Sequence, residues 1–270
     1  MNTMSTTEAM ICKNCGATGS GKHCYQCGQK LQTERLTLHT ILHEVFHYFT
    51  HVDKGFGYTF KQLAVRPGSM QKEFVEGMRA NHQKPFSMFF LCGTISGLGY
   101  YFINLAYQNI HQRDSSAEAD FFRHYFVLLQ ALLMPVYTLV LWALFKNEKK
   151  NYAEILVLCL YSFSFVFIVL IFINAVKLIF PDYENRYVEV AFLLVYNNLT
   201  NLRFFSRKPW AVIAKTVVML AVSFTLSQVM IAAVLNWFSR SAPYPFHFFL
   251  YRFAFAGRGR SGHMRQVEEA

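Results

Sequence analysis

"AEILVLCLYSFSFVFIVLIFINAVKLI", residues 153–179, is a long apolar stretch whose two charged side chains, Glu154 and Lys177, lie near its ends. A helix rises about 1.5 Å per residue, so about 20 apolar residues cross the hydrocarbon core of a bilayer. Charged groups near the ends of such a helix can extend into the headgroup region. The stretch therefore predicts a transmembrane helix.

The composition of the whole chain agrees with this interpretation. Of its 270 residues, 53% are hydrophobic and 28 are phenylalanine, and the mean hydropathy is +0.21. A soluble domain of this length has no core large enough to bury so much apolar surface. The apolar excess lies after residue 85, which indicates a membrane protein with several spans.

The apolar runs predict a bundle of about five transmembrane helices. We place them at residues 86–107, 121–145, 153–179, 187–205 and 210–238. The fourth is the weakest, because polar side chains gather in its C-terminal half, so a bundle of four spans stays open. These side chains are Asn197, Asn198, Thr200 and Asn201. In a membrane they favour hydrogen bonds between helices over a substrate site.

The charges of the loops predict the orientation. Lys and Arg are frequent before the first span, between the second and third, and between the fourth and fifth, but sparse in the other two loops. Because cytoplasmic loops are enriched in Lys and Arg, the N-terminus is expected in the cytoplasm. The basic tail falls on the opposite side if there are five spans, against this rule. Residues 241–270 are predicted to form an interfacial segment and this basic, flexible tail.

The net charge of +10 bears on the partners of the chain. In a soluble protein it would suggest nucleic acid, but here the basic residues mostly flank apolar runs. We therefore expect the lipid bilayer, with anionic headgroups at its cytoplasmic face, and no nucleic acid. No cleavable signal peptide is expected, since no basic segment followed by an apolar stretch begins the chain. A homo-oligomer stays open.

The N-terminal region carries a metal-binding pattern. "CKNCGATGSGKHCYQCGQ", residues 12–29, contains two C-x-x-C pairs separated by eight residues, each followed by a glycine where the backbone must turn. Four thiolates at this spacing suit a tetrahedral, closed zinc site. The predicted ligands are Cys12, Cys15, Cys24 and Cys27. We expect one structural Zn²⁺ per chain in a zinc ribbon over residues 10–30, which is a small module for binding a protein partner.

Two other uses of these cysteines are less well supported. Disulfides would need an oxidising compartment, which nothing in the sequence indicates. A redox C-x-x-C pair would normally begin a helix in a βαβ unit, and no such pattern occurs.

A histidine stripe comes after the ribbon. "LHTILHEVFHYFTHVDKG", residues 38–55, has histidines at every fourth position and contains HEVFH, residues 43–47. In a zinc metalloprotease, His43 and His47 would bind zinc and Glu44 would act as the general base. A third ligand at a recognisable spacing is missing, and leucine and phenylalanine fill the opposite face. We therefore favour an amphipathic helix at the membrane surface, with catalysis by Glu44 as the alternative.

Several motifs between the ribbon and the first span resemble a known family. "LHEVFHYFTHVDKGF", "RPGSMQKEFVEGMR" and "KPFSMFF", together with the zinc knuckles, are similar to the family called domain of unknown function 3667. The resemblance covers roughly residues 10–90. It implies a bacterial membrane protein, and hence the inner membrane, with the four cysteines as zinc ligands. It implies no catalytic residue.

The predicted architecture is thus mostly α-helical. A zinc ribbon at residues 10–30 precedes amphipathic juxtamembrane helices at 36–84, with Ser69 as an expected N-cap, and a transmembrane bundle at 86–240. The sequence favours a non-enzymatic scaffold, adaptor or sensor. A membrane-bound zinc metalloprotease using HEVFH is the alternative, and a small transporter or lipid-handling protein is a further one.

Overall fold

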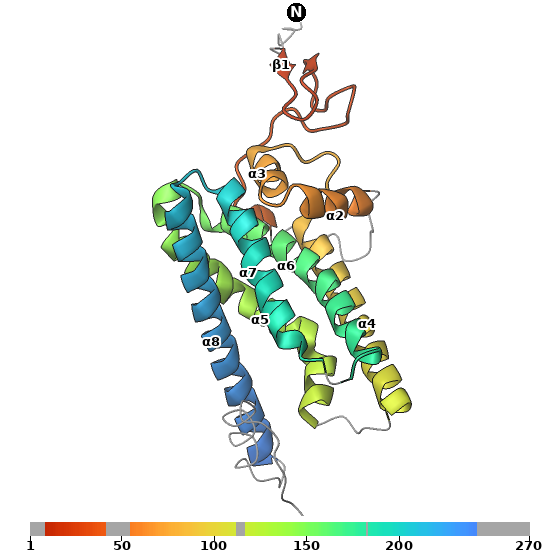
Figure 1. The fold of residues 1–270 in the computed structure, drawn as a ribbon. Helices are drawn as coiled ribbons and strands as arrows, with labels where there is room; N and C mark the ends of the chain where they lie inside the picture. The colour runs from red at the N-terminus through yellow and green to blue at the C-terminus, as the bar shows by residue number, and fades with distance from the viewer. Residues whose placement is uncertain (1–8, 42–54, 112–116, 182, 242–270) are drawn as a thin grey trace, which may run out of the picture. The chain divides into compact units, whose positions relative to one another are not determined.

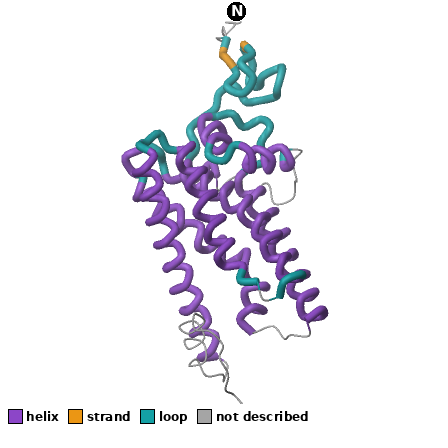
Figure 2. The backbone as a smooth tube through the Cα atoms, in the orientation of Figure 1, coloured by secondary structure: helices purple, strands orange, loops and turns teal. Residues whose placement is uncertain are grey.

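The computed structural model describes residues 9–41, 55–111, 117–181 and 183–241, without the side chains of 117–127, 231 and 234–241. The chain is mostly helical (Figure 2). Its elements are β1 (Met10–Ile11), β2 (Thr18–Gly19), α2 (Phe56–Val65), α3 (Ser69–Glu76), α4 (Pro85–His111), α5 (Ala117–Leu144), the 3-10 turn η1 (Lys146–Glu148), α6 (Tyr152–Ala175), η2 (Val176–Leu178), α7 (Asn185–Phe204) and α8 (Pro209–Ser241). Each predicted span is therefore a helix. Residues 1–223 and 224–270 form two compact units, and the first contains every element up to the part of α8 that precedes residue 224.

Helix α6 is the centre of this first unit, with α4 and α7 beside it in Figure 1. Nearly every residue from 153 to 167 is buried, because α2, α3, α4, α5 and α7 all pack against this helix. A helix that is apolar on all sides suits such a position. Its buried hydroxyls bond within the fold, as Ser162 Oγ and Ser164 Oγ donate to the carbonyls of Leu158 and Leu160.

Helices α4 and α6 approach each other closely. A Cβ added to Gly99 would lie 3.1 Å from two side-chain carbon atoms of Ile171, so a larger residue would have to displace this side chain. Ser96 Oγ, which is buried, donates to the carbonyl of Phe167 at 3.2 Å. Small residues that bring backbones together are typical of helix pairs in membranes.

Helices α2 and α3 are short, and they pack on α6 and its neighbours. Leu63, Met70 and Phe74 are fully or nearly fully buried, and the Phe74 ring lies edge-on to Tyr161 of α6 at 5.3 Å. The N-cap of α3 is Gly68 and not Ser69, which is the first helical residue. The reason is local: the Gly68 N–H donates to the side chain of Gln71.

Gly68 also marks a close contact with α7. Its φ of 82° lies in a region that side chains with a Cβ rarely adopt. A Cβ at this position would lie 2.1 Å from the carbonyl oxygen of Thr200. The turn between α2 and α3 therefore fits against α7 only because residue 68 is glycine.

Three helices among the described residues are long and apolar enough to cross a membrane. They are Pro85–His111, Tyr152–Leu178 and Pro209–Met230, and Leu128–Leu144 is a shorter apolar helix. Helix α7 is not among the three, so the prediction of five spans is not confirmed. Large apolar side chains are exposed on α4 and α8, for example Phe102 and Trp210. Exposed apolar surface of this kind is consistent with contact with lipid.

The polar side chains of α7 do not all act as predicted. Asn201 Nδ2 donates to Thr216 Oγ1 of α8 at 3.0 Å, which is a hydrogen bond between helices. Asn197 and Asn198 instead donate to carbonyls of their own helix, four residues earlier. The Nδ2 groups of these two amides therefore bond within α7 and not between helices.

Candidate metal centre

The four predicted cysteines lie on two backbone turns of the same design. In the first, Cys12 N–H donates to the Ala17 carbonyl and Gly16 N–H donates to the Cys12 carbonyl, at 2.8 and 2.9 Å. In the second, residues 24–29 repeat both bonds at the same two distances. Gly16 and Gly28 have φ of 76° and 72°, which is why glycine comes after each C-x-x-C pair.

The two turns bring the four sulfur atoms together. All four lie within 4.8 Å of one another, with Cys12 Sγ 3.6 Å from Cys27 Sγ and Cys15 Sγ 3.5 Å from Cys24 Sγ. A metal with sulfur ligands at about 2.3 Å in a tetrahedron separates them by about 3.8 Å. All four cysteines are free thiols. The cluster is therefore close to the size that one metal ion needs.

Backbone groups favour the thiolate form of two of these cysteines. The backbone N–H of Cys15 is the main cause that lowers the pKa of Cys12 to about 7. The N–H of Cys27, followed by that of Gln26, lowers the pKa of Cys24. The Ala17 N–H acts in the same direction on Cys15, but desolvation and the hydrogen bond with Cys24 outweigh it and raise that pKa to about 12. A bound metal cation would offset this rise in the pKa of Cys15, because its positive charge stabilises the thiolate.

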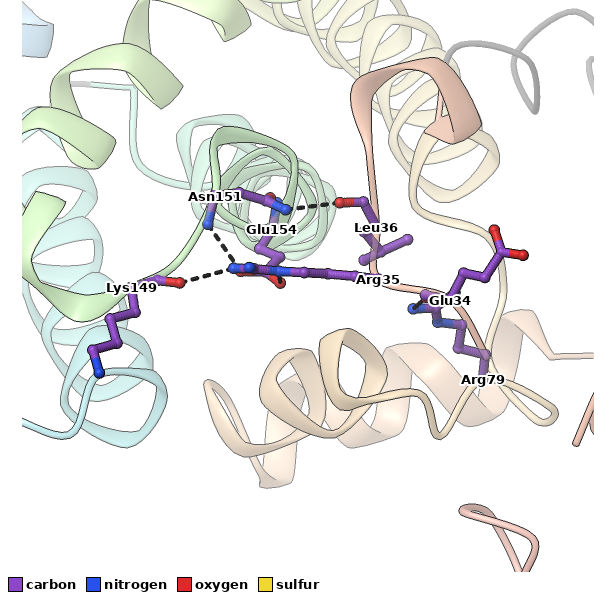
Figure 3. A network of polar contacts seen from close by, with 7 residues as sticks. All are labelled: Glu34, Arg35, Leu36, Arg79, Lys149, Asn151 and Glu154. Carbon is purple, nitrogen blue, oxygen red and sulfur yellow. Dashed lines mark hydrogen bonds and ion pairs between the residues drawn. The ribbon is translucent and has the colours of Figure 1, made fainter. Parts of the chain in front are cut away.

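A short linker, which includes Glu34, Arg35 and Leu36, joins the cysteine module to the helices, and Figure 3 shows its contacts. The Arg35 guanidinium binds both carboxylate oxygens of Glu154, at 2.8 and 3.1 Å, and the Lys149 carbonyl at 2.8 Å. Asn151 Nδ2 donates to the Leu36 carbonyl at 2.8 Å. The linker is thus fixed to the beginning of α6.

Glu154 has a second role in the same place. Its carboxylate accepts a hydrogen bond from Asn151 N–H, and its own N–H donates to Asn151 Oδ1. This capping box begins α6 and holds the carboxylate where Arg35 reaches it. The side chain of Glu154 is only 6% exposed, so an ionised partner is needed there.

Arg79 connects the module to α3. The backbone N–H of Arg79 donates to Gln29 Oε1 at 3.1 Å, and its guanidinium donates to the carbonyls of Phe74 and Glu34. Gly77, with φ of 113°, lies against the side chains of Thr33 and Lys13. The residues just after α3 therefore contact both the module and its linker.

The alternative catalytic residues cannot be placed in this arrangement. His43, Glu44 and His47 lie outside the described residues. Helical residues begin at 38, where Thr37 Oγ1 accepts the N–H of Thr40 at 3.2 Å, and the described residues end at 41. The metalloprotease hypothesis stays an untested alternative.

Sequence reasoning missed Arg35 and Glu154. Glu154 was expected to extend toward the lipid headgroups, but it is buried in an ion pair. One signal was present, because Asn151 three residues before Glu154 and just ahead of an apolar run is the pattern of a capping box. Nothing local marks Arg35 as its partner.

The fold and the site define a mostly helical protein whose described part contains three candidate membrane-spanning helices and an N-terminal cluster of four cysteines able to bind a metal ion. Residues 53–97 match the family model described as "Protein of unknown function (DUF3667)", which confirms the family resemblance over this segment; the match does not include the zinc knuckles. The matched segment runs from the residues before α2 into the first half of α4. No curated protein and no solved structure matches the chain.

Proposed function

We propose that this chain is a non-enzymatic, multi-pass protein of the bacterial inner membrane whose zinc ribbon acts as a cytoplasmic adaptor. The observation that carries the proposal is the attachment of the four-cysteine module to α6 through Arg35 and Glu154. A module fixed in this way presents its outer surface from a defined place on the helices. Four thiol ligands leave no open coordination position for a substrate, which supports a structural metal.

The outer surface of the module has features of a binding site. Tyr25, inside the second C-x-x-C pair, is 81% exposed, and Ile11, next to Cys12, is 70% exposed. Tyrosine is enriched at the centres of protein interfaces, because it buries a large apolar ring and keeps a hydrogen-bonding group. These two side chains are the proposed contact with a protein partner.

Zinc content and crosslinking test this proposal together. We expect one zinc per purified chain, which is lost in Cys24→Ser. A photo-crosslinking residue at position 25 should yield one defined adduct in cells, and the same residue at Tyr58 on α2 serves as the control. Loss of the adduct on Cys24→Ser supports an adaptor that depends on the folded ribbon. A metal-free native chain, or identical products from both positions, argues against it.

Orientation has its own test. A single cysteine at Asn147 should be protected from a membrane-impermeant reagent in intact cells, and one at Ser116 should react, because the loop with Lys146, Lys149 and Lys150 is predicted to be cytoplasmic. The opposite labelling would invert the topology. A second bound zinc that disappears in His43→Ala, with loss of function in Glu44→Gln, would instead favour the metalloprotease.

A further inference from the structure

A cleft of about 500 Å³ lies where the linker, the end of α3 and the turn between α5 and α6 meet. Four segments line it: the first cysteine turn through Lys13, the linker through residues 33–35, α3 with the nearby Arg79, and residues 148–150 with Glu154. A cleft of this volume is in the range of sites for small molecules and lipid headgroups. It lies beside the network drawn in Figure 3.

The charges around this cleft favour an anion. Two of its four carboxylates are already paired, Glu154 with Arg35 and Glu148 with Arg207. The carboxylates of Glu34 and Glu76 then line the cleft together with the ammonium groups of Lys13, Lys149 and Lys150. Arg79, which has partners of its own, belongs to the same wall. The remaining excess is positive, in a hollow where charges from separate parts of the chain converge.

The backbone at Lys149 has an uncommon conformation in the wall of the cleft. Its φ of 56° makes it the one non-glycine residue with positive φ among the described residues. Such a conformation is uncommon outside glycine and persists where neighbouring contacts hold it. Here the Lys149 carbonyl accepts a hydrogen bond from Arg35. The chain thus turns sharply at the wall of the cleft, where the consecutive side chains of Lys149 and Lys150 both line it.

Part of the cationic wall is held in place. The Arg79 guanidinium is fixed by two backbone carbonyls and lies 5.6 Å above the Phe74 ring, and the Lys150 ammonium lies 5.5 Å above the Phe204 ring. Groups that are already positioned lose less entropy when a ligand binds. Lysine ammonium and arginine guanidinium groups are the common protein donors to phosphate.

From this geometry we propose that the cleft binds a phosphate-bearing anion. Its ligand is either a soluble phosphate compound or the headgroup of an anionic lipid, which share this chemistry. The choice of a lipid headgroup as the ligand rests on the proposed function, because it requires this side of the helices to face the membrane surface. A soluble phosphate reaches the cleft without that condition.

The test uses the full chain, purified in detergent for inorganic phosphate and placed in vesicles with or without phosphatidylglycerol for the lipid. The cleft variant is Lys149→Gln with Lys150→Gln. The matched control is Lys22→Gln with Lys61→Gln, which removes the same charge from two exposed lysines that do not line the cleft. Lys13→Gln is a second cleft variant, in case the first does not fold.

We expect saturable binding that the cleft variant weakens about tenfold, the size of one strong charged contact, and that the control leaves within about twofold of wild type. If inorganic phosphate competes with phosphatidylglycerol, one site binds both, which supports the proposal. Phosphate binding without lipid binding also supports the cleft and assigns it a soluble ligand. Equal weakening in both double variants, or no saturable binding of either probe, overturns the proposal. Zinc content, measured in parallel, separates this failure from failure of the ribbon.

Discussion

Replacement of Gly68 by alanine should destabilise the first compact unit, residues 1–223, more than the same replacement at any other described glycine. The new Cβ would lie 2.1 Å from the Thr200 carbonyl oxygen and 2.8 Å from Arg203 Cβ. The first of these neighbours is backbone, so it moves only if α7 moves. Ordinary carbon–oxygen contacts exceed about 3 Å, and the packing must therefore shift by about 1 Å.

Two costs add at this position. A side chain at φ of 82° costs about 1–2 kcal/mol, and overpacking of a tight contact costs about 1–3 kcal/mol. A total near 3 kcal/mol corresponds to a fall in Tm of about 6–12 °C for a chain of this size. The loss should appear in the contact between α3 and α7, since both neighbours of the new methyl group belong to α7.

Thermal unfolding of the detergent-purified chain, monitored by circular dichroism, measures this effect against two controls. Gly77→Ala has the same kind of backbone strain, but its Cβ meets the side chains of Thr33 and Lys13, which can move. It should lower Tm by less than half as much. Gly57→Ala, in α2 with nothing within 4 Å of its Cβ, should leave Tm unchanged or raise it slightly. A Gly68→Ala protein as stable as Gly77→Ala would refute the role given to the Thr200 carbonyl.

Three further predictions concern Arg35 in the linker, His82 between α3 and α4, and the cysteine module. Arg35→Ala should lower Tm and speed proteolysis of the linker, because the charged hydrogen bonds to Glu154 are lost, although the 60% exposure of Arg35 limits the effect. Glu154→Gln should have a smaller effect, because it keeps an acceptor for the Asn151 N–H. Burial lowers the pKa of His82, so the folded state favours the neutral imidazole. The stability that this side chain contributes is complete above about pH 6.5 and is lost as the pH falls below that value, so His82→Phe should flatten the dependence of Tm on pH. Cys24→Ser should release the metal, measured by elemental analysis, while the far-UV spectrum keeps the helical signal, because the module has its own small core; loss of that signal would contradict this independence.

Much of the fold could be predicted from the sequence, because local patterns determined it. The five apolar runs coincide with five helices, since length and composition are sufficient to specify an apolar helix. The four cysteines were identified as one cluster by their spacing, because the turn that each C-x-x-C pair forms depends on a few neighbouring residues.

Two features of the site could not be predicted in this way. Arg35 and Glu154 are 119 residues apart in the sequence, and no local pattern relates them. The cleft requires charges from four segments, each of which resembles an ordinary solvated loop when it is considered alone. Only the folded chain shows that they converge.

The first half of α6 is the clearest example of this division. By itself, the sequence determined that residues 153–179 form a long apolar helix. Only the tertiary structure decided that residues 153–167 are enclosed by five other helices. The physical reason is that lipid and a protein core are both apolar surroundings, so the same side chains satisfy either. The Gly68 turn is a second example, since a glycine suggests a turn, but only the Thr200 carbonyl against it makes glycine necessary.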